Sequence, residues 1–195
     1  MKHRIQCVAF DGAKRIASGE LREVAQKAQK MAAATVLIFD DATCETIHVD
    51  LSGSPRELAK RLETSVPESP AEADEPRAPG RPKLGVVARE VTLLPRHWEW
   101  LNLQPGGASV ALRKLIDEAR RAHRETDRLR LAKEAAYRFV SAMAGNETGF
   151  EEATRGLFAG DAIRFAQHSR TWPQDVREHA AKLAARVFEG SESHP

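Results

Sequence analysis

In the first sixty residues of the chain, some runs of hydrophobic residues have the pattern of a β-strand and others have the spacing of an α-helix. Short β-rich runs alternate with a run in which Leu21, Val24, Ala28 and Met31 share one helical face. Asp11-Gly12 separates the first two runs and is a strong hairpin signal. Ser54-Pro55-Arg56-Glu57 has the form of a capping box with proline at the first helical position. The pattern predicts the order ββαββα, with strands at 5–10, 14–18, 35–39 and 45–51 and helices over 21–33 and from residue 54.

A proline-rich stretch from Thr64 to Pro82 follows this first part. It holds five of the ten prolines of the chain, interleaved with Glu, Ser and Ala. Such a composition cannot bury apolar surface and is typical of a semi-extended, disordered linker. We therefore expect three parts: an N-terminal α+β domain over residues 1–63, a linker over 64–82, and a further ordered region over 83–190.

The ordered region that follows the linker begins with one predicted strand and continues as helices. Residues 86–94 are rich in β-branched side chains, and Pro95 then opens a short helix with Trp98 and Leu101 on one side. Ser109 is expected to cap a second helix. No glycine or proline interrupts residues 108–144, so this segment is either one long helix or two that break within 120–128. Two further helices are expected beyond Gly145: one over 150–159, followed by a new cap at Asp161, and one over 173–188. The fold class is α+β with an all-helical C-terminal part.

Charge is unevenly distributed along the chain, although the net charge is only +2. Residues 77–138 carry 14 Lys and Arg against 7 Asp and Glu, whereas the segments on either side are both net negative. A basic segment between acidic ones indicates a surface that faces a polyanion.

Residue patterns for catalysis or metal binding are weak. Residues 36–43 resemble the phosphatase loop of haloacid-dehalogenase-like enzymes, but Ala42 stands where that loop needs its second carboxylate. No histidine pair has metal-binding helical spacing, so His97, His123, His168 and His179 are expected to be partly exposed helix residues. Asp11, Asp40 and Asp41 are interpreted as solvated turn residues, with a divalent ion as the alternative. Cys7 and Cys44 are expected to be buried and reduced. We predict no enzyme activity, metal or cofactor.

Membrane and secretion signals are not apparent. The chain contains no run of about eighteen apolar residues that would span a bilayer. Met1-Lys2-His3-Arg4 leads into no long apolar stretch. A cytoplasmic location is therefore expected.

Residues 89–119 resemble a ribbon-helix-helix domain. Leu94-Pro95 match the end of its strand, Gly106-Gly107 its turn, and Ser109, Ala111 and Leu112 the start of its second helix. The resemblance implies a homodimer in which two strands form a ribbon that enters the DNA major groove. The implied interface comprises Val91, Leu93, Trp98, Leu101, Leu112, Leu115 and Ile116. The DNA contacts expected in this segment are Arg89, Arg96, Ser109 and Arg113, and Arg81 and Lys83 of the basic stretch before it are expected to contribute as well.

Two further features bear on this DNA hypothesis. Pro79 to Lys83 resemble the Gly-Arg-Pro core of an AT-hook, which implies an arginine in a narrow minor groove. Counting back from Pro95, the groove-facing strand positions are Leu93, Val91 and Arg89, which offer few base-reading groups. Either the register is shifted by one residue or the ribbon is covered on both faces.

The whole chain is similar to a family of uncharacterised bacterial proteins, a domain-of-unknown-function family. The similarity rests on Phe10-Asp11-Gly12, Phe39 to Thr43, Gly80 to Trp98 and Phe158 to Asp161. It implies no activity. Two functions remain open: a dimeric DNA-binding, regulatory protein that contacts mainly the phosphate backbone, or a homodimeric scaffold for an unidentified protein partner.

Overall fold

The computed structural model describes residues 5–31, 35–64 and 89–191. Their contacts divide the chain into two compact units. The first unit combines residues 1–66 with 125–195, and the second spans 67–124. The first unit therefore joins the predicted N-terminal domain to the C-terminal helices, which the sequence pattern had placed in separate parts. The physical reason is a sheet that is apolar on both faces.

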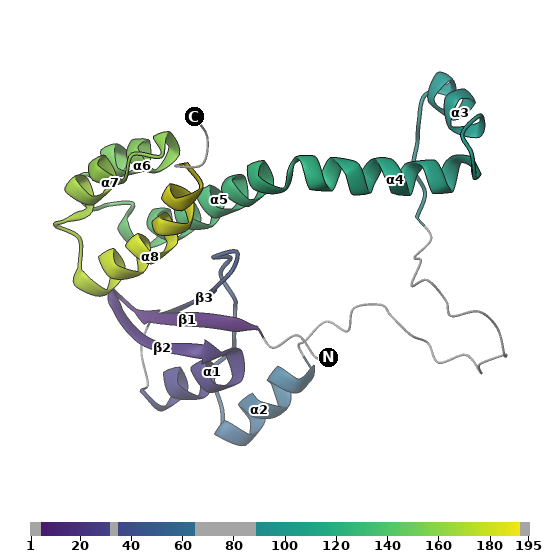
Figure 1. The fold of residues 1–195 in the computed structure, drawn as a ribbon. Helices are drawn as coiled ribbons and strands as arrows, with labels where there is room; N and C mark the ends of the chain where they lie inside the picture. Colours follow the sequence, from purple (N-terminus) through teal and green to yellow (C-terminus); the bar gives the residue numbers. More distant parts are fainter. Residues whose placement is uncertain (1–4, 32–34, 65–88, 192–195) are drawn as a thin grey trace. The chain divides into compact units, whose positions relative to one another are not determined.

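Three antiparallel strands form this sheet in the order β2-β1-β3 (Figure 1). They are β1 (Gln6–Asp11), β2 (Lys14–Glu20) and β3 (Val36–Asp40). The predicted hairpin at Asp11-Gly12 is confirmed, and Gly12 adopts a positive φ of 54° that the turn requires. The fourth predicted strand, over 45–51, is wrong: only one bridge joins Thr46 to Phe39. Beyond it Ile47, Val49 and Leu51 pack against the core below the sheet.

Successive residues of β1 serve two different hydrophobic cores. Cys7 and Ala9 pack with α1 (Leu21–Lys30), whereas Val8 and Phe10 pack with the C-terminal helices. All four side chains are buried, as expected for a strand covered on both faces. Figure 1 shows α1 and α2 on one side of the sheet and α5 and α8 on the other. The three layers thus share one small sheet.

The C-terminal half of this unit is entirely helical. It comprises α5 (Arg124–Ala144), α6 (Phe150–Ala159), α7 (Ala162–Ser169) and α8 (Gln174–Ser191). Gly160 ends α6 in the left-handed region with φ 75°, and the Asp161 side chain accepts a hydrogen bond from the Arg164 amide at the start of α7. The helix and cap predicted for residues 150–161 are confirmed, as is the α+β class with a helical C-terminal part.

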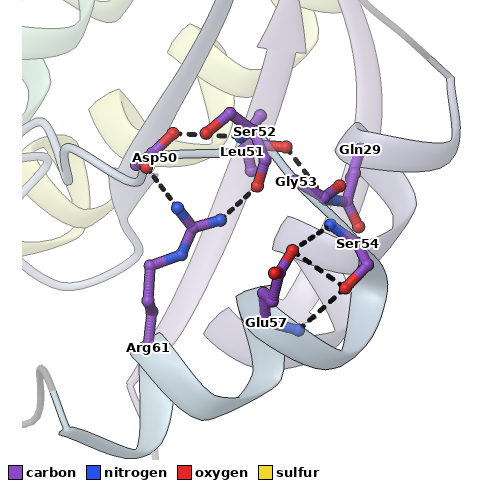
Figure 2. Close-up of polar contacts among 8 residues, drawn as sticks. All are labelled: Gln29, Asp50, Leu51, Ser52, Gly53, Ser54, Glu57 and Arg61. Carbon is purple, nitrogen blue, oxygen red and sulfur yellow. Dashed lines mark hydrogen bonds and ion pairs between the residues drawn. The ribbon is translucent and has the colours of Figure 1, made fainter.

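The predicted capping box at the start of α2 (Pro55–Thr64) is confirmed (Figure 2). The Ser54 amide donates to Glu57 Oε2 at 2.7 Å, and the Glu57 amide donates to Ser54 Oγ at 3.3 Å. These bonds satisfy donors that the first helical turn leaves without partners. Because α2 continues to Thr64, it reaches into the expected linker, whose remaining residues lie outside the described ranges.

His179 on α8 lies in the aromatic core rather than at the surface, so the expectation of a partly exposed residue is wrong. It is 2% exposed, and its ring lies 4.6 Å from Phe139 and 5.7 Å from Phe10. Burial, together with the charge of the nearby Lys182, lowers the pKa of His179 from 6.5 to about 4. The side chain is therefore neutral at pH 7 and packs as an aromatic ring.

Both cysteines are buried and unpaired, which confirms their expected state. Burial, together with the charges of Asp40 and Asp41, raises the pKa of Cys7 to about 11. Burial likewise raises the pKa of Cys44 to about 11. Thiols of this kind are unreactive at neutral pH.

The second unit contains α3 (Pro95–Asn102) and α4 (Gly107–Ala122). Of the two alternatives for residues 108–144, the structure has two helices, because His123 leaves the helical conformation between α4 and α5. The cap predicted at Ser109 is wrong: Gly106, with φ 86°, is the N-cap, and Ser109 lies inside the first turn of α4. The strand predicted over 86–94 is not present at residues 89–94, which have no ladder partner among the described residues, and residues 86–88 lie outside the described ranges.

Candidate nucleic-acid interface

Helices α3 and α4 form a hairpin with a very small core of its own. Leu101 of α3 is 3% exposed and Ala111 of α4 is 7% exposed, and these are the buried hydrophobic residues of the described part of this unit. The left-handed Gly106 allows the sharp turn between the helices, because a side chain there would be strained at φ 86° and would approach Val110 to 3.2 Å. Leu101, predicted at a dimer interface, is thus already buried within one chain.

Most of the other large apolar side chains of this unit face solvent. Leu115 and Ile116 of α4 are 43% and 54% exposed, and Trp98 of α3 is 38% exposed. Leu112 is half-buried and shares its helical face with Leu115, Ile116 and Ala119. We call Leu112, Leu115, Ile116 and Ala119 the α4 stripe. The apolar face of an amphipathic helix normally packs against another element, and in the hairpin most of the α4 stripe has no such neighbour.

Exposed basic side chains flank the α4 stripe. Arg113, Lys114, Arg120 and Arg121 of α4 are exposed, as are Arg89 and Arg96 before it. Arg113 Nε donates to the Ser109 carbonyl at 3.1 Å, and Arg121 Nε donates to the Asp117 carbonyl at 3.1 Å. Among the residues that the structure describes, no carboxylate forms an ion pair with any of these six cations.

Three of the five basic residues of α5 differ from those of α4, because carboxylates of the same helix pair with them. Arg128 pairs with Glu125 at 2.8 Å, and Arg130 pairs with Glu134 at 2.9 Å and with Asp127 at 3.4 Å. Arg138 pairs with Glu134 at 3.7 Å. Within the described ranges, the net charge is +2 both for residues 89–123 and for residues 124–138, but most basic side chains without a carboxylate partner lie on α3, α4 and the segment that precedes them.

The start of α4 carries no acidic residue in its first turn. Ser109 is exposed there, and the amides of this turn have no side-chain cap at Gly106. The positive end of the helix dipole and the amides of this turn can attract an anion. Ser109 lies within the first turn, so it would contribute its hydroxyl from there and not as the N-cap.

The predicted contact residues divide into four groups by their position. Arg81 and Lys83 lie outside the described residues. Arg89, Arg96, Ser109, Arg113, Val91, Trp98, Leu115 and Ile116 are exposed, Leu93 and Leu112 are half-buried, and Leu101 is buried. Two apolar residues were missed: Trp100 is 49% exposed and Leu103 is 83% exposed. Trp100 lies in the last turn of α3 and Leu103 is its C-cap, and their spacing of three could have indicated a second apolar surface.

The turn aspartates of the first unit have structural roles. Asp40 Oδ1 accepts from the amides of Ala42 and Thr43, both at 2.8 Å, and so closes the turn after β3. Asp41 is not simply solvated, because Lys182 binds it at 3.1 Å and Arg186 approaches it from the same helix. Burial alone would raise the pKa of Asp41, but the hydrogen bond and charge of Lys182 lower it overall. The described residues contain no group of three His, Cys, Asp or Glu side chains arranged to hold a metal.

Comparison with known proteins places the chain in a family without assigning it an activity. In the described residues, no helix is long and apolar enough to cross a membrane. No curated protein and no solved structure matches the chain. The model of one family, described as an uncharacterized protein conserved in bacteria (DUF2239), matches residues 6–184, and the chain therefore belongs to that family.

Proposed function

We propose that this protein is a homodimer that binds duplex DNA through its phosphate backbone, with a regulatory role in the cytoplasm. The observation that carries the proposal is the α4 stripe, exposed in a single chain and flanked by cations that have no carboxylate partner among the described residues. The stripe supports association, and the cations support a polyanionic ligand.

A second copy is the partner that best fits the α4 stripe. Among its described residues, the hairpin buries only Leu101 and Ala111, so most of its apolar surface is exposed in a single chain. Residues 89–94 precede it, and Leu94 is extended with φ −67° and ψ 149°. Val91 and Thr92 favour β-structure, and the same segment of a second copy offers a complementary antiparallel edge. This arrangement would complete a ribbon and bury both stripes in one shared core.

Phosphate contacts account for the expected mode of DNA binding better than base contacts. The side chains of Val91 and Leu93 offer no hydrogen-bond donor to a base edge, whereas guanidinium groups bind phosphate in bidentate fashion. Binding should therefore be weak in sequence preference and strongly dependent on salt.

A homodimeric scaffold for another protein is the second candidate. It is favoured by Trp100 and Leu103, which are exposed and lie outside the predicted dimer interface. Tryptophan is enriched at the centres of protein interfaces. In that case the stripe serves dimerisation alone.

Fluorescence anisotropy on one A·T-rich and one G·C-rich duplex separates the two candidates. For DNA binding, the logarithm of the affinity should fall linearly with the logarithm of salt concentration, by about 0.9 per neutralised phosphate. Arg113→Ala should weaken binding to both duplexes equally and reduce that slope by roughly one unit. Arg130→Ala is the matched control, because Arg130 is already paired with Glu134 and Asp127. Absence of binding at low salt would leave the scaffold as the function.

A further inference from the structure

Helices α7 and α8 leave a groove between them that their own side chains do not fill. The groove has a volume of about 330 Å³. Residues between Phe165 and Arg170 of α7 form one wall, and residues between Arg177 and Ala181 of α8 form the other. We call this cavity the α7–α8 groove. Its volume falls within the range of small-molecule sites, which begins at about 300 Å³.

The lining of the α7–α8 groove is apolar where the two helices face each other. Phe165 is 3% exposed, and its ring lies 6.1 Å from Trp172 and 5.9 Å from Phe188 in edge-to-face geometry. Ala166 and Ala181, one on each helix, also line the groove and are exposed. Because the side chain of alanine ends at the Cβ atom, these two residues leave the space between the helices open.

The apolar surface continues along α7 beyond the groove. Ile163 lies three residues before Ala166 and seven before Arg170, so the three residues share one face of the helix. Ile163 is 72% exposed. Seven residues of an α-helix span about 10 Å along its axis. This face is therefore apolar at one end and positively charged at the other.

Two guanidinium groups mark the charged end of the groove. The side chain of Arg177 reaches across to α7, where its Nη1 donates to the Arg170 carbonyl at 2.7 Å. Within residues 5–31, 35–64 and 89–191, no carboxylate forms an ion pair with Arg170 or Arg177. Each guanidinium has several N–H donors, so most donors of this pair remain available to an anion.

The carboxylate in the lining of the groove already has partners. Gln174 Nε2 donates to Glu178 Oε1 at 2.9 Å, and Arg15 Nη2 lies 3.9 Å from Glu178 Oε2. The lining contains two guanidinium groups against this one carboxylate, which leaves it with a single excess positive charge. A monoanion matches that charge.

The walls suit an aliphatic or aromatic chain better than a polypeptide. Both walls are helical, and a helix does not present the alternating backbone donors and acceptors that an extended peptide requires. Ser169, which is 3% exposed, carries the one uncharged polar side chain of the lining. A ligand with polar groups along its whole length would bury them without partners. The occupant therefore has an apolar body and its charge at one end.

We propose that the α7–α8 groove binds a small monocarboxylate with an apolar chain, such as a medium-chain fatty acid. The carboxylate accepts hydrogen bonds from Arg170 and Arg177, whose guanidinium groups match its geometry. The apolar chain lies against Phe165 and extends along α7 toward Ile163. Charge complementarity selects the anion, and burial of the chain supplies further affinity. This inference does not depend on the proposed DNA binding.

Titration of the full-length protein with octanoate, followed through its amide resonances, gives the first test. We expect a dissociation constant of about 1 mM or lower, with shifts at Ala166, Ser169 and Ala181. Acetate carries the charge without the chain, and octan-1-ol carries the chain without the charge. Each of these two compounds should therefore bind at least about tenfold more weakly than octanoate. Octanol binding as tight as that of octanoate, no shifts, or shifts confined to residues outside α7 and α8 would each overturn the proposal.

An arginine variant connects binding with the charged end of the groove. Arg170→Gln removes a guanidinium that has no carboxylate partner among the described residues, and it should weaken octanoate binding at least about fivefold without changing octanol binding. Arg155→Gln is the matched control, because Arg155 lies on α6 outside the groove and pairs with Glu152. Equal effects of the two variants would mean that only the overall charge matters, and the proposal would fail.

A second variant fills the groove. Ala181→Phe should abolish octanoate binding, and circular dichroism shows whether the helices are retained. Binding by this variant as tight as that of the wild type would place the ligand elsewhere and overturn the proposal. Shifts at Ala166 and Ala181 that grow with protein concentration in the absence of ligand would show that a second copy covers the groove, which would also refute it.

Discussion

Substitution of Leu115 by aspartate separates dimerisation from folding. Leu115 is 43% exposed in a single chain, so a carboxylate at this position of α4 stays hydrated in the monomer. The cost to the monomer is about 0.5 kcal/mol of helix propensity plus part of the lost apolar contact. In a dimer joined through the α4 stripe, the same carboxylate would be buried without a partner, at about 3–5 kcal/mol.

This difference predicts a large effect on association. With about 1.4 kcal/mol for each factor of ten, Leu115→Asp should raise the dimer dissociation constant at least about 100-fold. Multi-angle light scattering from low to high micromolar concentration measures the dissociation constant, and circular dichroism shows whether the helices are retained. Lys114→Asp is the matched control, since it places the same side chain one residue away on the polar face of α4 and should leave association unchanged.

Three results would refute this reasoning. A wild-type monomer at about 50 μM would leave the α4 stripe without its proposed partner. Unchanged association of Leu115→Asp would place the interface elsewhere. Loss of helical signal in Leu115→Asp but not in Lys114→Asp would mean that Leu115 packs within one chain, contrary to its exposure.

Four further predictions concern the first unit. Burial lowers the pKa of His179 from 6.5 to about 4, so the neutral side chain contributes its full stability above pH 6.5, and the free energy of unfolding should fall by about 3 kcal/mol between pH 6.5 and 4. In urea unfolding, His179→Phe should flatten this part of the pH profile. A variant profile identical to that of the wild type would contradict this assignment. Gly53→Ala should destabilise more than Gly12→Ala, although both glycines have positive φ, because the new carbon at Gly53 would lie 2.6 Å from Glu57 Oε2 and would move this side chain away from its bonds to Ser54. Equal losses of melting temperature would argue against this coupling. Ser54→Ala should cost about 1 kcal/mol in urea unfolding through loss of the cap, and no loss would mean that the capping box contributes nothing. Cys7 and Cys44 should resist iodoacetamide at pH 8 until denaturant is added, and rapid labelling of the native protein, followed by mass spectrometry, would show that the thiols are accessible.

Local signals in the sequence predicted the secondary structure well. Asp11-Gly12, the Ser54–Glu57 box and Gly160-Asp161 each specify a turn or a cap through their own side chains or backbone freedom, and each is present in the structure. Apolar and polar residues alternate over 45–51 as in a strand, but a strand also needs hydrogen bonds to a neighbour, and this segment forms only one bridge to β3. The end of this segment is instead bonded to Gln29 of α1 and Arg61 of α2, which bind residues 50–53 and which no pattern within residues 45–51 indicates.

The candidate site could be predicted in composition but only partly in geometry. The positive excess of residues 77–138 was visible by counting, yet the count did not reveal that Arg128, Arg130 and Arg138 are neutralised on α5. Spacing alone contained that information, because Glu125, Asp127 and Glu134 lie three or four residues from their partners. The cap was misplaced at Ser109 because Gly106 can begin a helix in the left-handed region, which only a glycine adopts readily.

The boundary between the two units has a cause that is visible in β1. Cys7, Val8, Ala9 and Phe10 are four consecutive apolar residues, and a strand with one solvated face would alternate instead. Helix α1 covers only the face that bears Cys7 and Ala9, so the first 63 residues cannot bury Val8 and Phe10 by themselves. The second cover comes from α5 and α8, more than a hundred residues later in the chain. Residues 67–124 are therefore an insertion between two halves of one core. Because the core of the first unit is formed without this insertion, the exposed apolar and basic residues of the insertion are not needed for that core. We therefore explain them by binding to a partner.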